Sequence, residues 1–221
     1  CEQNTKVWRK KYIENKENKT FIDIGANIGA CIFEMLLATD ANIIAFEPSP
    51  RNLFCLTSTL LRLHPDLRSR VTLFPIGIGD KKTSEIMFGA QGNYGNSVIG
   101  GIVPDQDRFA QTFSSPEIVY IEALESILNA HQPIHLMKID AQGYECKIMK
   151  GMGTQLAQRV HMIFTEVAPR WLEHQGCNSA QLFRIAKEMG FQIKLKTDGL
   201  VLNAPLGPPE PNDYEIVLSR S

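Results

Sequence analysis

The feature that most constrains the fold is one segment near the start of the chain, a predicted buried strand that runs into a glycine turn and then a helix. The segment reads TFIDIGANIGA over residues 20–30, and an amphipathic helical pattern follows it. Gly25 and Gly29 allow the backbone to approach a ligand closely, and the start of a helix offers unpaired N–H groups. The segment therefore predicts an α/β domain with a ligand crevice at this turn.

The rest of the chain alternates short apolar runs with amphipathic segments, which is typical of a mostly parallel sheet with helices on both faces. The predicted strands are Phe21 to Ile24, Ile43 to Phe46, Val71 to Ile78, Ile134 to Ile139, Met162 to Val167, Phe191 to Leu195 and Tyr214 to Leu218, the last two as an antiparallel hairpin. Capping signals support two of the helices. Ser49 and Pro50 begin one, and Asn178 with Gln181 begins another.

A single domain of 221 residues accounts for the whole chain. Residues 1–19 are expected to form an N-terminal helical or extended segment. Residues 81–132 interrupt the alternation with a glycine-rich insertion, and its position after the carboxyl end of a strand predicts that it covers the crevice. Candidates within it for lining an acceptor pocket are Asn93, Asn96 and Ser97, with turn formation as the alternative role of these residues.

The glycine spacing also narrows the class of ligand. Glu47 follows the second predicted strand, about 20 residues beyond the turn, where nucleoside-binding folds place an acid for the ribose hydroxyls. Dinucleotide sites read G-x-G-x-x-G, whereas this turn reads Gly25-Ala-Asn-Ile-Gly29, and no P-loop follows. Adenosine without phosphates therefore fits better. The negative charge of Asp23 suits a sulfonium and an ammonium group.

Three motifs together carry a family resemblance. They are DIGANIG at Asp23 to Gly29, AFEPSPRN at Ala45 to Asn52, and MKIDAQGYE at Met137 to Glu145, followed by Lys150-Gly151. In this order and spacing, the chain from about Phe21 to Glu166 resembles the FkbM family of S-adenosylmethionine-dependent methyltransferases. The resemblance implies a class I, Rossmann-like, seven-stranded sheet with an antiparallel last strand. It also implies S-adenosylmethionine as cofactor and O-methylation of a hydroxyl on a sugar, lipid or natural-product-like small molecule.

The resemblance also implies a set of cofactor-binding residues. They are Asp23, Gly25, Ala26, Asn27, Gly29, Glu47, Pro48, Asn52, Gly77 and Asp80. The first motif is expected to contact the methionine half of the cofactor, Glu47 the ribose, and the turn from Gly77 to Asp80 the adenine. The family usually reads KIDxEGxE, and this chain has Gln142 in place of the first Glu of that motif. A methyltransferase-fold binding module with impaired catalysis therefore stays open as an alternative function.

Methyl transfer is an in-line displacement, so alignment supplies much of the catalysis and a base assists a hydroxyl acceptor. Asp140, at the end of the fourth predicted strand, is the first candidate for that base, and Glu166, at the end of the fifth, is the second. The alternatives are a cofactor contact for Asp140 and a structural role for Glu166. No metal site is predicted, because the motifs contain no compact cluster of ligands.

Composition excludes several other classes of function. The formal net charge is -1, and the basic residues around Lys6 to Lys11 are attributed to a solvated helix face, so a nucleic-acid partner is not expected. No apolar run reaches the roughly 18 residues of a membrane span. The five cysteines are widely spaced without a C-x-x-C pair, which favours buried free thiols. A nucleotide-dependent oxidoreductase is the weaker alternative, since G-x-G-x-x-G is missing. The chain begins at Cys1 rather than Met, so no compartment is predicted.

Overall fold

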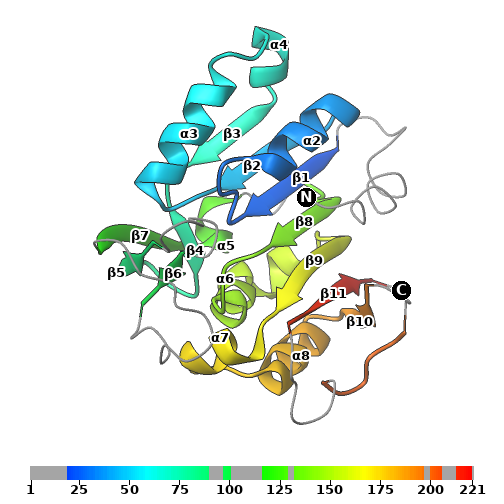
Figure 1. Cartoon of the computed structure of the whole chain (residues 1–221). Coiled ribbons are helices and arrows are strands. Elements are labelled where there is room, and N and C mark those ends of the chain that lie inside the picture. The colour runs from blue at the N-terminus through cyan, green and yellow to red at the C-terminus, as the bar shows by residue number, and fades with distance from the viewer. Residues whose placement is uncertain are drawn as a thin grey trace.

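The computed structural model describes residues 19–89, 97–100, 116–128, 132–196, 200–205 and 213–220. Its helices are α2 (Ala30–Ala38), α3 (Pro50–Leu60), α4 (Pro65–Arg68), α5 (Leu124–Ile127), α6 (Glu145–Ala157), α7 (Pro169–His174) and α8 (Ser179–Glu188). Its strands are β1 (Thr20–Ile24), β2 (Asn42–Phe46), β3 (Val71–Phe74), β4 (Gly77–Gly79), β5 (Thr83–Phe88), β6 (Val98–Ile99), β7 (Glu117–Ala123), β8 (Leu136–Ile139), β9 (Met162–Val167), β10 (Gln192–Leu195) and β11 (Tyr214–Ser219). Figure 1 shows how they are arranged.

The main sheet has seven strands in the order β10-β11-β9-β8-β1-β2-β3 (Figure 1). All neighbours are parallel except β11, which pairs antiparallel with both β9 and β10. The Rossmann-like sheet with its reversed last strand and the terminal hairpin are therefore confirmed. The chain leaves β1 toward β2 on one side and later returns to β8 on the other, which opens a crevice at the carboxyl ends of the central strands.

Alternating side chains of the strands build a core on each face of the sheet. On one face Phe21, Ile43 and Leu136 pack with residues of α2 and α3. On the other, Ile22 and Met137 pack with residues of α6 and α8. The two predicted caps are confirmed, because the Ser49 and Asn178 side chains accept hydrogen bonds from the first turns of α3 and α8.

The prediction of one strand over Val71 to Ile78 is wrong. Strand β3 ends at Phe74, and beyond Pro75, which has no N–H to donate to the ladder, the chain enters β4 of a second sheet. That sheet has the order β4-β7-β5-β6. Helix α6 packs directly on β4, since a Cβ on Gly151 would lie 1.7 Å from the carbonyl oxygen of Gly79. The small sheet is thereby held against the main core.

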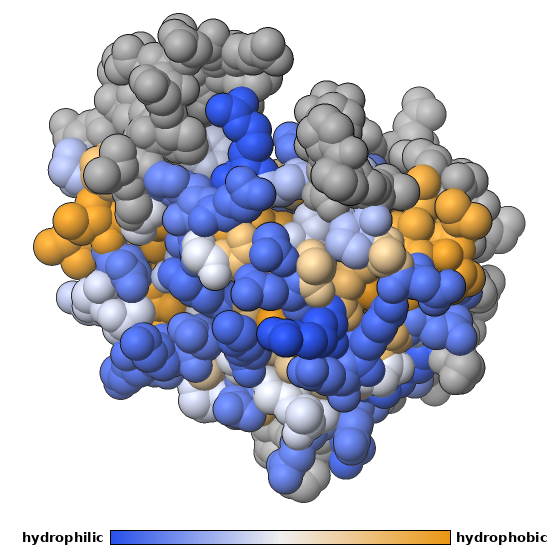
Figure 2. Space-filling model, turned by 90° about the horizontal axis from the view of Figure 1, so that it is seen from below, coloured by the Kyte–Doolittle hydropathy of each residue, from blue (hydrophilic) through white to orange (hydrophobic). Residues whose placement is uncertain are grey.

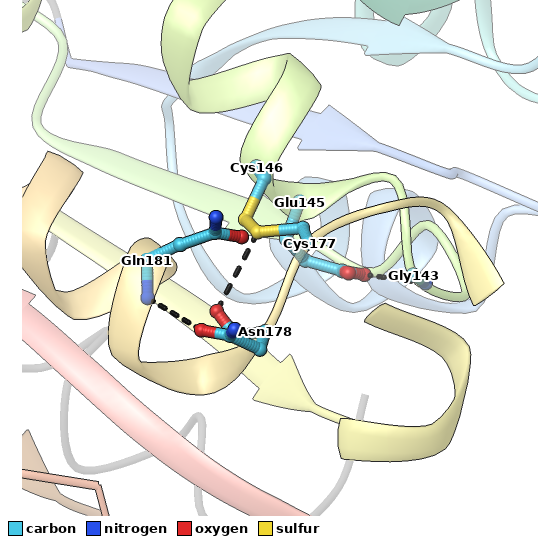
Figure 3. The surroundings of a disulfide bond; sticks show 6 residues. All are labelled: Gly143, Glu145, Cys146, Cys177, Asn178 and Gln181. Carbon is cyan, nitrogen blue, oxygen red and sulfur yellow. Dashed lines mark hydrogen bonds between the residues drawn. A yellow bond between two sulfur atoms is a disulfide. The ribbon is translucent and has the colours of Figure 1, made fainter. Parts of the chain in front are cut away.

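The expectation of buried free thiols is also wrong. Cys146 and Cys177 form a disulfide between the first turn of α6 and the segment before α8 (Figure 3). Cys31 is disulfide-bonded as well, and Cys55 is a free thiol but exposed. Cys146 and Cys177 are 31 residues apart in sequence, yet their Cα atoms lie 6.5 Å apart. The pairing could not be predicted from the sequence, because only the packing of α6 near α7 and α8 brings the two cysteines together. Cys1 lies outside the described residues.

The surface seen from below is largely hydrophilic, with hydrophobic side chains toward its left and right edges (Figure 2). The left edge is the side on which β5 and β7 lie in Figure 1, and the exposed large side chains of these strands include Ile86 and Ile118. No helix in the described ranges is long and apolar enough to cross a membrane. The predicted basic cluster around Lys6 to Lys11 lies outside the described residues.

Candidate active site

A cavity opens where the loop between β1 and α2 meets the ends of β2 and β8; it is called the loop cavity below. The predicted cofactor residues that line it are Gly25, Ala26, Asn27, Glu47, Pro48, Asn52 and Gly77. Asp140 and Gln142 line it as well, from beyond β8, and Ser97, Met87 and Ile99 do so from the segment 81–132. The structure thus brings seven of the ten predicted cofactor residues to one cavity. Asn93 and Asn96 lie outside the described residues.

Glu47 connects the glycine loop to the start of α3. Its Oε2 accepts a hydrogen bond from the backbone N–H of Asn27 at 2.7 Å. Its Oε1 accepts from the backbone N–H of Ser49 at 2.9 Å and from Nδ2 of Asn52 at 3.2 Å. Burial raises the pKa of Glu47, and these hydrogen bonds oppose that rise. Oε1 thus has both of its lone pairs engaged, whereas Oε2 has one lone-pair direction left for a further donor such as a hydroxyl.

The backbone of the glycine loop is fixed by its two flanking strands. The N–H groups of Gly25 and Ala26 both donate to the carbonyl oxygen of Phe46, each at 3.0 Å. Gly25 has φ 80°, and a Cβ there would lie 2.0 Å from the carbonyl oxygen of Asp140. Asn27 follows with φ 52°, a left-handed conformation that Asn adopts more readily than most residues. Only glycine at position 25 lets the loop pass this close to the end of β8.

Three predicted cofactor residues do not line the loop cavity. Asp23 is fully buried below the loop. Gly29 caps α2 with φ 93°, and a Cβ there would lie 2.4 Å from the side chain of Leu56, so this glycine serves helix packing. Asp80 follows β4 and is exposed.

Sequence reasoning missed Lys138 as a residue of the site. Its Nζ lies 3.1 Å from Asp23 Oδ1 and 3.4 Å from Asp140 Oδ2, and it donates to the carbonyl oxygen of Gly25 at 3.1 Å. Burial alone would lower the pKa of Lys138, but the two carboxylates raise it above its ordinary value. A lysine in an otherwise apolar strand was the available signal. Its partner became visible only with the strand order, which sets Lys138 opposite Asp23 in the β1–β8 register.

Asp140 has a partner on each carboxylate oxygen. Lys138 contacts Oδ2, and Nε2 of Gln142 donates to Oδ1 at 3.3 Å. Gln142 has φ 48°, an uncommon conformation for a residue with a long side chain. The residue that departs from the family motif therefore donates a hydrogen bond to Asp140, which a glutamate could do only when protonated.

Glu145 organises the turn that follows Asp140. Its Oε1 accepts from the backbone N–H groups of Ala141 at 3.2 Å and Gly143 at 3.3 Å. No donor within the described residues reaches its buried Oε2, and burial raises its pKa to about 7. The Cys146–Cys177 disulfide follows immediately in the chain, as Figure 3 shows. The turn between Asp140 and α6 is therefore held by its hydrogen bonds to the Glu145 carboxylate and by the disulfide at the start of α6.

Glu166 lines a second cavity, called the sheet cavity below, on the α2 face of the main sheet. In the described part of the chain, its carboxylate has no hydrogen bond or ion pair. Burial raises the pKa of Glu166 to about 7, and the nearby carboxylates of Asp140, Asp213 and Glu215 add to the rise. The sheet cavity and the loop cavity share Cys31, Lys138 and Asp140 in their walls. The two cavities are thus adjacent, with Asp140 between them.

Within the described residues, no group of three or more His, Cys, Asp or Glu side chains is placed to hold a metal ion. His135, one of the two histidines that lie four apart in sequence, instead accepts a hydrogen bond from the backbone N–H of Thr20.

Comparison with known proteins identifies the family and the fold. Residues 23–193 match the Methyltransferase FkbM domain. The hexuronic acid methyltransferase AglP of Haloferax volcanii is 29% identical over 198 residues, which cover 86% of this chain and 69% of that protein. The fold is similar to that of SMU.1697c from Streptococcus mutans in complex with SAH, with a TM-score of 0.55, 11% identity and coverage of 100% and 99% of the two chains.

The fold is also similar to precorrin-6y C5,15-methyltransferase from Geobacter metallireducens, with a TM-score of 0.50, 13% identity and coverage of 100% and 89%. At such identities the structures show the fold alone, whereas the family match covers most of the chain. This chain belongs to the FkbM family of S-adenosylmethionine-dependent methyltransferases.

Proposed function

We propose that this enzyme methylates a hydroxyl oxygen of a sugar-like small molecule and that Glu166 is the general base. The supporting observation is the state of Glu166, a carboxylate without a bonded donor in the described structure and with a pKa of about 7. A general base acts best when its pKa lies near the working pH. A hydroxyl acceptor needs such a base, because it must lose its proton as it is methylated.

A sugar acceptor is supported by the relative AglP, which is named a hexuronic acid methyltransferase. The loop cavity suits the cofactor, because Glu47 offers a buried carboxylate for ribose hydroxyls while Ile24, Phe46 and Ile78 offer an apolar wall for adenine. Asp140 supplies negative charge at the border of the two cavities, where a sulfonium and an ammonium are stabilised.

The chain has separate residues for holding the cofactor and for moving the proton. Bound S-adenosylmethionine supplies a methyl group on a positively charged sulfur. Glu47, Asn27 and Asn52 orient the nucleoside, and Asp140 faces the charged half. Glu166 would take the hydroxyl proton as the acceptor oxygen receives the methyl group that the cofactor would supply.

Gln142 fits this division of roles. Its amide holds Asp140 through a hydrogen bond, and the base is a different residue on a different strand. Loss of the family's usual glutamate at this position therefore removes neither the acid beside the cofactor nor the proton acceptor. The observation favours an active enzyme over a binding module with impaired catalysis.

The test is transfer of a labelled methyl group from S-adenosylmethionine to hydroxyl, amine, thiol and RNA acceptors, each with and without EDTA. We expect transfer to oxygen that EDTA does not change. The rate should fall as the pH drops below about 7, because protonated Glu166 cannot accept a proton. Transfer only to nitrogen, or loss of activity in EDTA, would overturn the proposal.

A further inference from the structure

The sheet cavity carries a pattern of charge that bears on the identity of the acceptor. It has a volume of about 500 Å³, within the range of small-molecule sites. Its charged walls come from Lys138, Asp140, Glu166, Lys196 and Glu215. Its apolar wall includes Phe21, Met35 and Phe164. The cavity therefore combines polar groups that can fix hydroxyls with a floor of largely buried apolar side chains.

The charges in this cavity belong to neighbouring strands. Glu166 of β9 lies opposite Glu215 of β11 in the strand register. Lys196, just beyond β10, forms an ion pair with Glu215 at 2.5 Å. Lys138 of β8 forms an ion pair with Asp140. Both lysines of the cavity wall are thus paired with a carboxylate of the same wall.

Pairing leaves Glu166 as the uncompensated group. Three carboxylates and two ammonium groups line the cavity. The fully buried Asp23, which pairs with Lys138, adds a further carboxylate behind the wall. An acceptor carboxylate placed here would meet like charge without a free cation among the described wall residues. A neutral hydroxyl can instead donate to Glu166 or Glu215.

We propose that the sheet cavity is the acceptor site and that it takes a sugar without a carboxylate, in contrast to a uronic acid. This inference rests on the proposed function, since it places the acceptor beside Glu166 and next to the loop cavity. Electrostatic exclusion sets the specificity: the cavity binds uncharged sugar rings and repels their anionic counterparts. The hydroxyls of the sugar replace the hydration of the carboxylates.

The experiment is run at a pH well above 7, where Glu166 is ionised. It compares methyl glucoside with methyl glucuronide, which differ in one carboxylate, as ligands of the whole chain saturated with S-adenosylhomocysteine. Dissociation constants are measured by saturation-transfer NMR. We expect the glucuronide to bind about tenfold more weakly than the glucoside, the effect of one like charge in a partly buried site.

Two variants change the charge of the wall in opposite directions. Glu215→Gln releases Lys196 from its ion pair and should bring the two affinities close to equal. Lys196→Met leaves Glu215 uncompensated and should widen the ratio by a further factor of about three. The matched control is Glu188→Gln, which removes one negative charge from an exposed position on α8, and it should leave the ratio unchanged.

Equal binding of the two glycosides to the wild type overturns the inference. So does an absence of saturation transfer to either glycoside, or a ratio that both wall variants leave unchanged. The proposed function fails separately, when calorimetry finds no binding of S-adenosylhomocysteine. Cofactor binding without discrimination between the glycosides therefore removes only the assignment of the acceptor.

Discussion

The two cavities of the active site hold their carboxylates in different ways. In the loop cavity, Glu47 accepts hydrogen bonds from groups that are its neighbours in the loop and in α3. In the sheet cavity, charged side chains of neighbouring strands compensate one another, as Lys196 does for Glu215, and Glu166 is left with a raised pKa. The first arrangement fixes an acceptor of hydrogen bonds. The second keeps a carboxylate able to take a proton.

The largest effect is expected from Glu166→Gln. If Glu166 is the base, the substitution lowers kcat by about 100- to 10,000-fold and changes the dissociation constant of S-adenosylmethionine by less than about twofold. Steady-state kinetics and calorimetry measure the two quantities. The comparison variant is Asp140→Asn, which should affect cofactor binding and kcat together. If Asp140→Asn binds the cofactor normally and loses more kcat than Glu166→Gln, then Asp140 is the base and Glu166 is not.

The next effect concerns stability. Lys138→Met leaves Asp23 buried without its counter-charge, which should lower the free energy of unfolding by about 4 kcal/mol at neutral pH. Burial already raises the pKa of Asp23, and the loss of Lys138 raises it further. The variant should therefore become less stable as the pH rises, since the folded state then holds an unpaired carboxylate.

Urea unfolding at several pH values measures this change, and Asp23→Asn in the Lys138→Met background is its control. The double variant should recover most of the lost stability, because it has no charge to bury. Equal stability of the single and double variants would show that Lys138 contributes by packing alone.

A smaller effect is expected at Glu145, whose folded pKa of about 7 lies above its ordinary value of 4.5. Because the folded pKa is the higher one, its contribution is fully present below about 4.5 and is lost as the pH rises through about 7. Glu145→Gln should remove this loss and be more stable than the wild type by about 2 kcal/mol above that range. Chemical unfolding across the same range checks the slope, and parallel curves for the two proteins would contradict the prediction.

The smallest effect should come from Glu47→Gln in the loop cavity. The amide has one oxygen, so it can accept either from Asn27 or from Ser49 and Asn52, and it loses the charge. The affinity for S-adenosylmethionine should therefore fall about tenfold. Calorimetry measures it, with Glu188→Gln as the charge-matched control. An unchanged affinity would mean that Glu47 only connects the loop to α3 and does not bind the cofactor. The loop cavity would then no longer be distinguished from the sheet cavity by cofactor binding.

The loop cavity was predictable because its contacts are short in sequence. The Asp23 to Gly29 motif and Glu47 follow two consecutive strands, and parallel neighbours bring their carboxyl ends together. The alternation of apolar runs with amphipathic segments predicted the sheet, and the family resemblance implied its reversed last strand. Gly29 shows the limit of the motif, since its glycine is required by the packing of Leu56 and not by the cavity.

The sheet cavity was less predictable because its charges meet across strands that are distant in sequence. Lys138 and Asp23 are 115 residues apart, and their pairing follows from the register of β1 with β8. The spatial order of β9, β11 and β10 likewise decides that Lys196 can meet Glu215. Both candidates for the base were foreseen. Asp140 differs from Glu166 because Lys138 and Gln142, each two residues away in sequence, occupy its two carboxylate oxygens.

Whether the bond between Cys146 and Cys177 forms depends on the redox conditions around the enzyme. It closes a loop that contains β9, and so Glu166, and restricts the unfolded chain by about 3 to 4 kcal/mol in a chain-entropy estimate. Such bonds form in oxidising compartments and are rare where thioredoxin and glutathione keep thiols reduced. Protein produced in a reducing cytosol would therefore begin as the dithiol, with the base of α6 no longer tied to the segment before α8. An oxidising route of expression is the one that yields the enzyme in its cross-linked form.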